Sequence, residues 1–345
     1  MSQDIPSLNC KFLNCQETAL SFSSHCWAHA DKRSYLSNLG DALKVLGPGS
    51  VSLNLKKVEC GHLDFSGLDL KGSSFSQAEI AHCLFVGTTL VGCDMIGAKF
   101  SHCDFVGGEL QGSTFTRALF NHCSFSHSDF GKSYFVEAHF KEVDFMGASL
   151  CGAVLWNADI MGANNLKRKN FFDPESSGKK PKTYLSETNT LMANESYRNL
   201  KRYFYQKGLT EDASWAAYRE LTMERKHFFE TKDIRFVPSL FMDILSGYTE
   251  KPVRVILSSL GIVLIFGFAY FLLDAVRPTV ENSEGPVGFW NSIYFSFITF
   301  TTVGFGDFIP KTFLWVKILV AMEAFSGPFM AGLFIFTLTR RYAAG

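Results

Sequence analysis

The sequence predicts a chain of several domains, in which a β-solenoid is followed by an α-helical hairpin and then by a membrane domain with two spanning helices. Three patterns in the 345 residues support this prediction. Every fifth residue from Leu55 to Ile160 is apolar, and a period of five fits neither an α-helix nor a flat strand. Good helix formers flank Gly208. Two long apolar stretches lie after residue 252.

Composition and charge narrow the classes of function. The 33 Lys and Arg residues balance the 33 Asp and Glu residues, so no strong net field attracts nucleic acid, and we expect no nucleic-acid partner. Hydrophobic residues make up 47% of the chain, which is too apolar for a disordered protein. The sequence shows no nucleophile–base pair, phosphate-binding loop or open metal site, so we do not expect an enzyme.

The N-terminal segment, residues 1–50, contains a compact set of metal-ligand residues. Three cysteines and one histidine follow the spacing C-x4-C-x10-C-x2-H, namely Cys10, Cys15, Cys26 and His29. Three thiolates and one imidazole are the ligand set of a closed structural zinc site, so residues 10–29 predict a knuckle that binds Zn2+, with His25 as an alternative ligand. The competing interpretation is that surplus cysteines pack here as small hydrophobic side chains.

All nine cysteines lie before residue 152. The first residues lack the charged and apolar regions of a secretory signal peptide, so we expect the cysteine-bearing part of the chain in the reducing cytosol.

The repeat block covers residues 51–165. Small residues stand two positions before most of the apolar centres, as at Ala98 and Ala118, and one unit has the sequence NADIM at residues 157–161. This pattern resembles the pentapeptide-repeat family. The resemblance implies a right-handed quadrilateral β-helix with four repeats in each coil.

A second period, of twenty residues, marks one coil of this solenoid. Histidines recur at this spacing, at His62, His82, His102 and His122. We expect them at outward positions with rings stacked about 4.8 Å apart. A ladder kept for its shape is one interpretation, and a proton or metal sensor is the other. Cysteines with the same period are expected inside the coil as small apolar groups, namely Cys83, Cys103 and Cys123.

Two segments of different composition follow the repeats. Residues 166–183 combine cations and turn formers without apolar periodicity, which predicts a mobile linker. Its lysines would be solvated, or would contact anionic membrane lipid. Residues 184–237 predict a helical hairpin, in which Gly208 ends one helix and Thr210 begins the next.

Residues 238–345 predict a membrane domain. The first span covers about 253–273 and the second about 313–339. Basic residues lie before the first span and after the second, which predicts that both chain termini are cytoplasmic. We expect a two-span protein of the cell membrane, in a prokaryotic inner or plasma membrane.

The stretch between the spans carries the functional motif. Residues 289–301 are apolar and long enough for a helix that enters the membrane partway, and they lead into TTVGFGD at residues 301–307. Non-helical backbone at membrane depth is tolerated only where it lines a polar cavity, so the carbonyls should face a pore. TTVGFGD resembles the selectivity signature of potassium channels, and the order of helices matches their two-transmembrane pore module over residues 253–339.

The resemblance implies a homotetramer in which each chain supplies a quarter of a K+-selective filter. It assigns the ion-binding segment to Thr302, Val303, Gly304, Phe305 and Gly306, with Thr301 and Asp307 as supports. Glycine fits at 304 and 306, because carbonyls aimed inward in a row need φ values that residues with a Cβ avoid. Phe305 replaces the commoner Tyr. Ile298 occupies the position that holds a carboxyl partner for the filter Asp in some family members.

Three residues of the second span are candidates for gating. Gly327 and Pro328 could loosen the helix and form a hinge. The alternative is that Gly and Pro are simply frequent in membrane helices. Glu323 is ionisable within the membrane and is therefore a functional candidate, and its alternative role is a structural partner for pore-helix hydroxyls such as Ser292 or Thr299.

The leading functional interpretation is a potassium channel whose cytosolic β-helix regulates or anchors it. The alternative is a membrane-tethered pentapeptide-repeat binding module, such as a duplex mimic that captures a nucleic-acid enzyme. The repeat block has seven cations against twelve carboxylates, which is weak phosphate mimicry. No Arg-rich voltage sensor or dinucleotide fingerprint is visible, so the sequence leaves the gating stimulus and the partner of the β-helix open.

Overall fold

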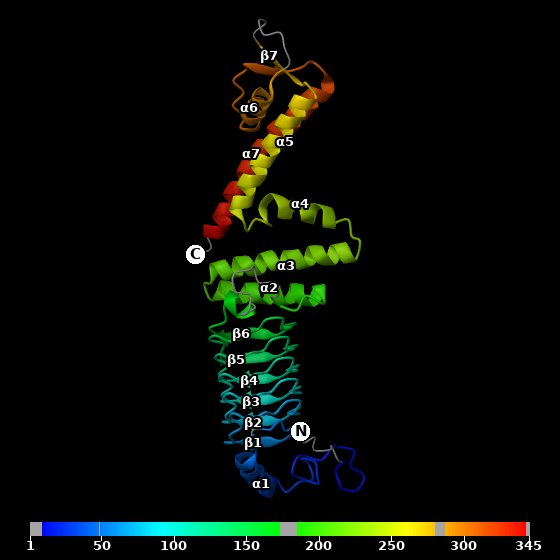
Figure 1. Ribbon diagram of the computed structural model, residues 1–345, viewed down its shortest axis with the longest axis vertical. Helices are drawn as coiled ribbons and strands as arrows, with labels where there is room; N and C mark the ends of the chain where they lie inside the picture. The colour runs from blue at the N-terminus through cyan, green and yellow to red at the C-terminus, as the bar shows by residue number, and fades with distance from the viewer. Residues whose placement is uncertain (1–8, 48, 173–184, 280–286, 343–345) are drawn as a thin grey trace. The chain divides into compact units, whose positions relative to one another are not determined.

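The computed structural model describes residues 9–47, 49–172, 185–279 and 287–342 (Figure 1). The chain divides into two compact units, residues 1–227 and residues 228–345. Each unit has its own hydrophobic core.

The first unit is built on a stack of parallel β-coils. Six short strands follow one another at intervals of twenty residues: β1 (Glu59–Gly61), β2 (Glu79–Ala81), β3 (Lys99–Ser101), β4 (Leu119–Asn121), β5 (His139–Asp144) and β6 (Asp159–Asn164). Each strand pairs in parallel with the next, as Cys60 does with Ile80. Parallel bridges at the same offset join the other faces, as between Asp64 and Leu84. The predicted β-helix with four repeats per coil is therefore confirmed.

The apolar centres of the repeats fill the inside of the coils. Phe65, Phe85 and Phe105 form one column, with ring centroids 4.7 Å apart at each step. Neighbouring faces contribute rings that pack edge-on, as Phe75 does against Phe85. Each of these phenylalanines is fully buried. Burial of one such side chain is worth about 1.5–3 kcal/mol, so the period of five is what stabilises the rod.

The corners of the coils explain the remaining periodic residues. The residue two positions after each centre repeatedly has a left-handed backbone, as at Gly67 (φ 70°) and His82 (φ 53°). Glycine recurs at these corners because it lacks the Cβ that makes this conformation costly.

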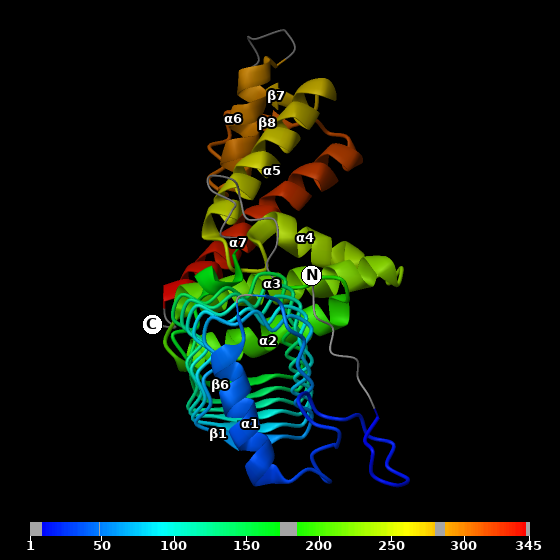
Figure 2. The same ribbon diagram turned by 60° about the horizontal axis from the view of Figure 1, so that its bottom comes forward.

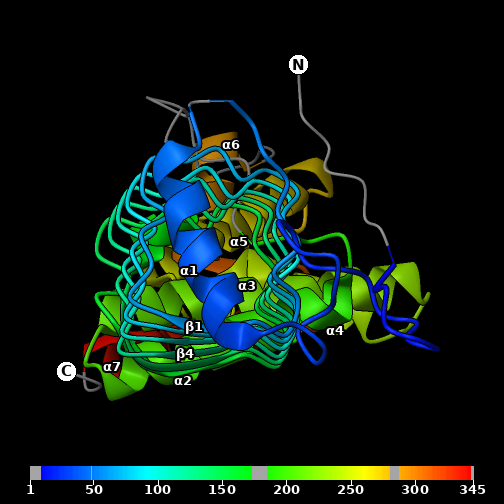
Figure 3. The ribbon, with the colours of Figure 1, turned by 90° about the horizontal axis from the view of Figure 1, so that it is seen from below.

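The helix α1 (Lys32–Val45) covers the N-terminal end of the rod. Figures 2 and 3 show it lying across the first coil. Its buried residues Tyr35, Leu39 and Leu43 belong to the same core as Leu53 and Leu55 of that coil. An apolar end that would otherwise face water is thereby closed, as terminal repeats of solenoids require.

The C-terminal end of the rod is closed by the segment that was expected to begin a linker. Leu166 and Phe171 are buried in the rod core, and residues 168–171 form a 3-10 helix, η1 (Arg168–Phe171). The amide of Asn170 donates hydrogen bonds to the carbonyls of Phe145 (3.0 Å) and Ala148 (2.6 Å). Residues 166–172 are thus packed instead of forming a tether, and the rest of the expected linker lies outside the described residues.

The helical hairpin packs on the same end. It consists of α2 (Thr190–Gln206) and α3 (Thr210–Glu230), joined through Gly208 at φ 70°. Asn189 caps α2 by accepting hydrogen bonds from two backbone N–H groups. Tyr197 and Phe204 are buried in the rod core, and the Tyr203 hydroxyl donates to the carbonyl of Ala163 (3.0 Å). The hairpin is therefore a cap of the solenoid.

The second unit contains two long apolar helices. Its elements are α4 (Phe236–Ser246), α5 (Pro252–Leu272), β7 (Val276–Pro278), α6 (Phe289–Phe300), β8 (Phe308–Pro310) and α7 (Leu314–Tyr342). The helix α5 and residues 314–340 of α7 are long and apolar enough to cross a membrane. The shorter α6 packs against both. The sequence did not predict α4, which ends at Gly247 in a left-handed conformation.

Candidate functional sites

The filter segment, residues 301–307, begins where α6 ends. The Thr302 N–H donates to the carbonyl of Thr299 and the Val303 N–H donates to the carbonyl of Ile298, both at 3.0 Å. This pair of bonds is the Schellman arrangement that closes a helix through one left-handed residue. That residue is Thr302, at φ 58°. A β-branched side chain is strained in this region, and such strain concentrates at functional sites.

Both glycines of the filter segment have left-handed backbones, with φ 55° at Gly304 and 81° at Gly306. A Cβ at either position would meet no atom within 4 Å, so backbone conformation and not crowding within the chain calls for glycine. Val303 is 54% exposed and Phe305 is 71% exposed. The chain's own atoms therefore leave two apolar side chains of the segment uncovered.

A two-stranded ribbon braces the outer end of the filter segment. Strand β8 directly follows the filter segment in the chain, and it pairs antiparallel with strand β7, which precedes α6. The Thr279 hydroxyl donates to the carbonyl of Gly306 (2.5 Å), and its N–H donates to the carbonyl of Asp307 (2.9 Å). Lys311 and Asp274 form an ion pair at the base of the ribbon. Sequence reasoning missed Thr279, because no local pattern links it to a segment nearly thirty residues away.

The side chain of Asp307 has a partner that the sequence did not suggest. Ile298, at the position where some family members carry a carboxyl group, is buried. One turn earlier on α6, the hydroxyl of Tyr294 lies close enough to the Asp307 carboxylate to interact with it. The Tyr294 ring also packs edge-on against Phe308 of β8. Tyr294 of α6 is therefore the neighbour of Asp307 that the sequence did not suggest.

Glu323 of α7 connects three helices of the second unit, hereafter the membrane unit, namely α5, α6 and α7. Its carboxylate is fully buried and accepts a 2.6 Å hydrogen bond from the hydroxyl of Tyr270 on α5. The hydroxyl of Ser296 on α6 contacts the other carboxylate oxygen and also the carbonyl of Val263. The expected hydroxyl partners Ser292 and Thr299 are not the ones used. The hydroxyl of Ser292 is directed to the carbonyl of Gly288.

Gly327 lies where the end of α6 packs closely against α7. This packing role is an alternative to the predicted hinge. The helix α7 continues through Gly327 and Pro328. A Cβ at Gly327 would lie 1.7 Å from the carbonyl oxygen of Phe300, so the end of α6 can approach α7 only at a residue without a side chain. Gly267 plays the same part on α5, where a Cβ would lie 2.5 Å from Cδ1 of Ile293. The sequence did not single out Gly267.

A polar cluster ties the end of α7 to the turn between α4 and α5. Arg340 forms an ion pair with the buried Glu250 (2.8 Å) and donates to the Thr249 hydroxyl (2.8 Å). On the other side of the turn, Arg254 forms an ion pair with Asp243 of α4 (2.6 Å). We call the pair Arg340–Glu250 the inner clasp.

The four periodic histidines form a ladder along one corner of the rod. Their rings stack nearly parallel, with centroids 5.1, 4.8 and 4.8 Å apart from His62 to His122. All four lie at exposed left-handed corners. The Nδ1 atom of His122 lies 2.9 Å from the carboxylate of Glu142, which continues the same corner in the next coil. The periodic cysteines, in contrast, are buried inside the rod.

The N-terminal Cys and His residues converge on one point. The ligand atoms of Cys10, Cys15, Cys26 and His29, hereafter the Cys/His cluster, all lie within 4.8 Å of one another. His25 instead contacts the hydroxyl of Ser24. Burial opposes ionisation of Cys10, but hydrogen bonds from the backbone N–H groups of Cys26 and Phe12 and from neighbouring side chains lower its pKa to about 6. Burial raises the pKa of Cys93, inside the rod, to about 12.

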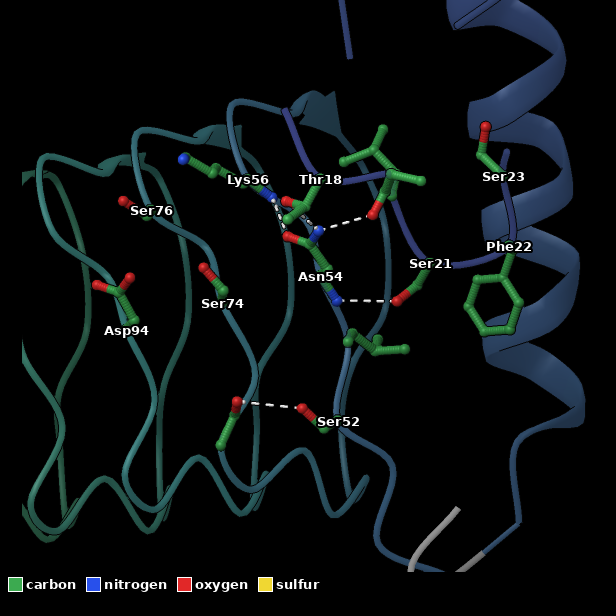
Figure 4. Close-up of a pocket in the computed structure, with 14 residues that line it drawn as sticks. Thr18, Ser21, Phe22, Ser23, Ser52, Asn54, Lys56, Ser74, Ser76 and Asp94 are labelled. Carbon is green, nitrogen blue, oxygen red and sulfur yellow. Dashed lines mark hydrogen bonds between the residues drawn. The ribbon is translucent and has the colours of Figure 1, made fainter. Parts of the chain in front are cut away.

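A polar groove lies where the N-terminal loop meets the first coils (Figure 4). Asn54 holds the two together, because its amide donates to the carbonyl of Ala19 (2.7 Å) and its N–H donates to the Ser21 hydroxyl (2.8 Å). The groove has a volume of about 500 Å³, and six of its fourteen lining residues carry hydroxyl side chains. It collects no group of catalytic residues.

Comparison with known proteins identifies two parts of the chain. Residues 258–344 match the model of an ion channel family, and residues 73–164 match the model of pentapeptide repeats. A 60-residue stretch is 45% identical to "Probable potassium channel protein 2" of Methanocaldococcus jannaschii; the match covers 17% of this chain and 15% of that protein.

Solved structures resemble the rod. A pentapeptide repeat protein from the Arabidopsis thaliana thylakoid lumen is 22% identical over 28% of this chain and 63% of its own, with a TM-score of 0.18. HetL from Nostoc, a pentapeptide repeat protein involved in heterocyst differentiation regulation, is 17% identical over 34% of this chain and 60% of its own, with a TM-score of 0.21.

Proposed function

We propose that the protein is a potassium-selective channel in which four copies of the chain surround one ion pathway. The observation that carries this proposal is the filter segment itself. It follows the end of a short helix held between two membrane helices, and its two glycines have the left-handed backbones that a row of inward carbonyls needs. The ion channel match covers this part of the chain, and a 60-residue stretch of the chain is 45% identical to a probable potassium channel protein.

The chemistry of permeation is exchange of water oxygens for protein oxygens. In the proposed filter, the carbonyls of Thr302, Val303, Gly304 and Phe305 and the Thr302 hydroxyl replace the hydration shell of K+. The C-terminal end of α6 directs the negative end of its helix dipole toward the same point. Thr279 holds the C-terminal end of the segment through its bonds to the carbonyls of Gly306 and Asp307, so this end is fixed before an ion arrives.

Exposure of the filter segment favours a tetramer. Val303 and Phe305 are more than half exposed in their own chain and lie next to one another in the segment, and contiguous exposed apolar surface marks an interaction site. Four copies would bury Phe305 and close the ring of oxygens. We expect the complex to have four chains when its mass is measured in detergent.

Charge supports a cytoplasmic position for both termini. Lys251 precedes α5, Arg254 lies in its first turn, and Arg340 ends the apolar part of α7. Positive charge collects on the cytoplasmic side of membrane proteins, so the β-helix should lie in the cytosol. There it can regulate or anchor the channel. The inner clasp offers a path for this control, because it joins the inner end of α7 to the turn after α4.

Ion flux into liposomes tests the proposal. The full-length protein, reconstituted with a K+ gradient, should carry K+ in strong preference to Na+, and Ba2+ should block the flux. Intact tetramers that carry both ions equally would contradict K+ selectivity. Correctly inserted protein that carries neither ion would favour the alternative of a membrane-tethered binding module.

A further inference from the structure

We propose that the Cys/His cluster binds one structural Zn2+ per chain, and that this ion fixes the N-terminal segment to the first coil of the β-helix. The site goes beyond the proposed channel function, because it lies in the other unit and needs no part of the ion pathway.

The distances within the cluster fit a tetrahedral zinc site. With Zn–S bonds of about 2.3 Å and a Zn–N bond of about 2.0 Å, tetrahedral geometry requires about 3.8 Å between two sulfurs and about 3.5 Å between sulfur and nitrogen. The sulfurs of Cys15 and Cys26 are 3.8 Å apart, and the Cys10 sulfur is 3.6 Å from Nδ1 of His29. The Cys26 sulfur is 3.2 Å from the same nitrogen, and the remaining ligand atoms lie within 4.8 Å of one another, so small side-chain shifts bring all four around one ion.

The surroundings favour a thiolate-bound metal over other uses of these residues. Cys10 and Cys26 are buried, and Cys15 and His29 are partly buried, so the ligand atoms are shielded from bulk solvent. The ring of Phe12 stacks on His29 at 3.9 Å and fixes its orientation. Soft thiolates select zinc over magnesium or calcium. Four protein ligands leave no open position, so the metal has a structural role and not a catalytic one.

The N-terminal loop has little regular structure of its own. Among described residues 9–31 the structure assigns no helix or strand beyond one bridge between Asn9 and Thr18. Leu20 and Trp27 pack in the rod core and Asn54 bonds to the loop, but the remaining contacts with the rod are exposed, such as Glu17 with Lys57 (2.7 Å). Exposed ion pairs contribute at most about 1 kcal/mol each. A segment this short usually needs a metal or a disulfide to hold one conformation.

The position of the site indicates which part of the chain the metal stabilises. His29 lies three residues before α1, which covers the open end of the rod with Leu39 and Leu43. On the other side, Asn54 of the first coil is bonded to the loop that carries Cys15 and Cys26. The metal therefore locks the connection between the cap helix and the coil that it covers.

Metal content and its dependence on single ligands test the proposal. Full-length protein expressed with zinc supplementation and purified in detergent should contain about one Zn per chain by elemental mass spectrometry. Cys26→Ser and His29→Gln should each lower this at least tenfold. Cys93→Ser is the matched control, because Ser113 and Ser133 occupy the same column and make the equivalent hydrogen bond as Cys93. His25→Gln is the control for histidine. Both controls should keep their zinc.

A second measurement keeps the test valid if a ligand variant is poorly folded. Parent protein stripped of metal and given Co2+ should develop the visible absorption bands of a tetrahedral cobalt–thiolate site, and chelation should make the first thirty residues sensitive to protease while the rod stays resistant. Parent protein without stoichiometric zinc and without cobalt bands would overturn the proposal. So would a Cys15–Cys26 disulfide found by thiol labelling, or equal zinc loss in Cys93→Ser.

Discussion

Glycines of the membrane unit are required for two separate reasons, and single substitutions distinguish them. Gly304 and Gly306 have open space where a Cβ would lie but a backbone that other residues avoid. Gly327 and Gly267 have helical backbones but no space. In the proposed channel the first pair shapes the path of the ion, whereas the second pair determines how closely the helices pack.

Replacing Gly306 with Ala should remove K+ selectivity or conduction while tetramers persist. Alanine at φ 81° costs about 1–2 kcal/mol, which the segment can relieve by turning a carbonyl away from the pore. Liposome flux with K+ and Na+ measures this. Gly288→Ala is the control, because Gly288 has φ −61° and open space for a Cβ. A Gly306→Ala channel as selective as the parent would show that the filter is misassigned.

Replacing Gly327 with Ala should destabilise the membrane unit. The new Cβ would overlap the carbonyl oxygen of Phe300, so α6 and α7 must separate, and we expect a loss of about 2 kcal/mol or more. Thermal unfolding of the complex in detergent measures the loss. Gly332→Ala, on the same helix with open space, should be neutral. Normal stability with altered gating in Gly327→Ala would instead support the hinge.

Elements contact one another through polar groups that lie far apart in the sequence. Glu323 links α7 to α5 and α6 through Tyr270 and Ser296, and the inner clasp links the end of α7 to the turn before α5. If the C-terminal end of α7 moves when the proposed channel opens, it must either break the inner clasp or move together with the turn before α5.

Replacing Glu250 with Gln should change channel opening and leave selectivity intact. The substitution removes the charge that holds Arg340, so the inner end of α7 is released from the α4–α5 turn. Open probability in single-channel recordings should shift severalfold. Asp233→Asn is the control, since its pair with the exposed Arg235 is local. Unchanged opening in Glu250→Gln would exclude the inner clasp from gating.

The histidine ladder is a second element with a testable response. Four rings about 4.8 Å apart cannot all carry charge cheaply, because each neighbouring pair repels by about 1 kcal/mol even in water. Acid should therefore strain the rod, and His82→Gln with His102→Gln should reduce that sensitivity. Open probability between pH 5 and 8, with and without Zn2+, measures the effect. Identical curves for parent and double variant would leave the ladder a structural feature.

At the scale of the whole molecule, the boundary between the two units decides where the chain can be cut. Deleting residues 1–182 would remove the rod but keep α2, exposing the apolar side chains of Tyr197, Leu200 and Phe204 that the rod covers. We expect that truncation to aggregate. Deleting residues 1–227 should leave a tetrameric K+ pore with altered opening, judged by size-exclusion chromatography and flux. Failure of the shorter truncate to assemble would show that the first unit holds the tetramer together.

Periodic and contiguous features could be predicted from the sequence, and contacts between elements could not. The five-residue period of apolar residues predicted the rod, because each of these residues occupies an equivalent position inside a coil. The filter segment could be recognised because its seven residues are adjacent in the sequence. Nothing local indicated that Thr279 binds Gly306, that Tyr270 binds Glu323, or that Gly267 accommodates Ile293. The linker was expected at 166 because the repeat stops there, yet Phe171 is an apolar residue that closes the rod.

The equivalence of the coils has a consequence for how this rod can vary over evolution. A duplication of twenty residues would lengthen it by one coil, about 4.8 Å, and both caps would still meet the faces they meet now. A duplication of five residues would rotate the C-terminal hairpin by a quarter turn relative to α1. The number of complete coils therefore sets the length of the rod, and the number of additional five-residue units sets the rotation of the hairpin about the rod axis. Duplication of repeats could change either one while the stacking contacts between coils stay the same.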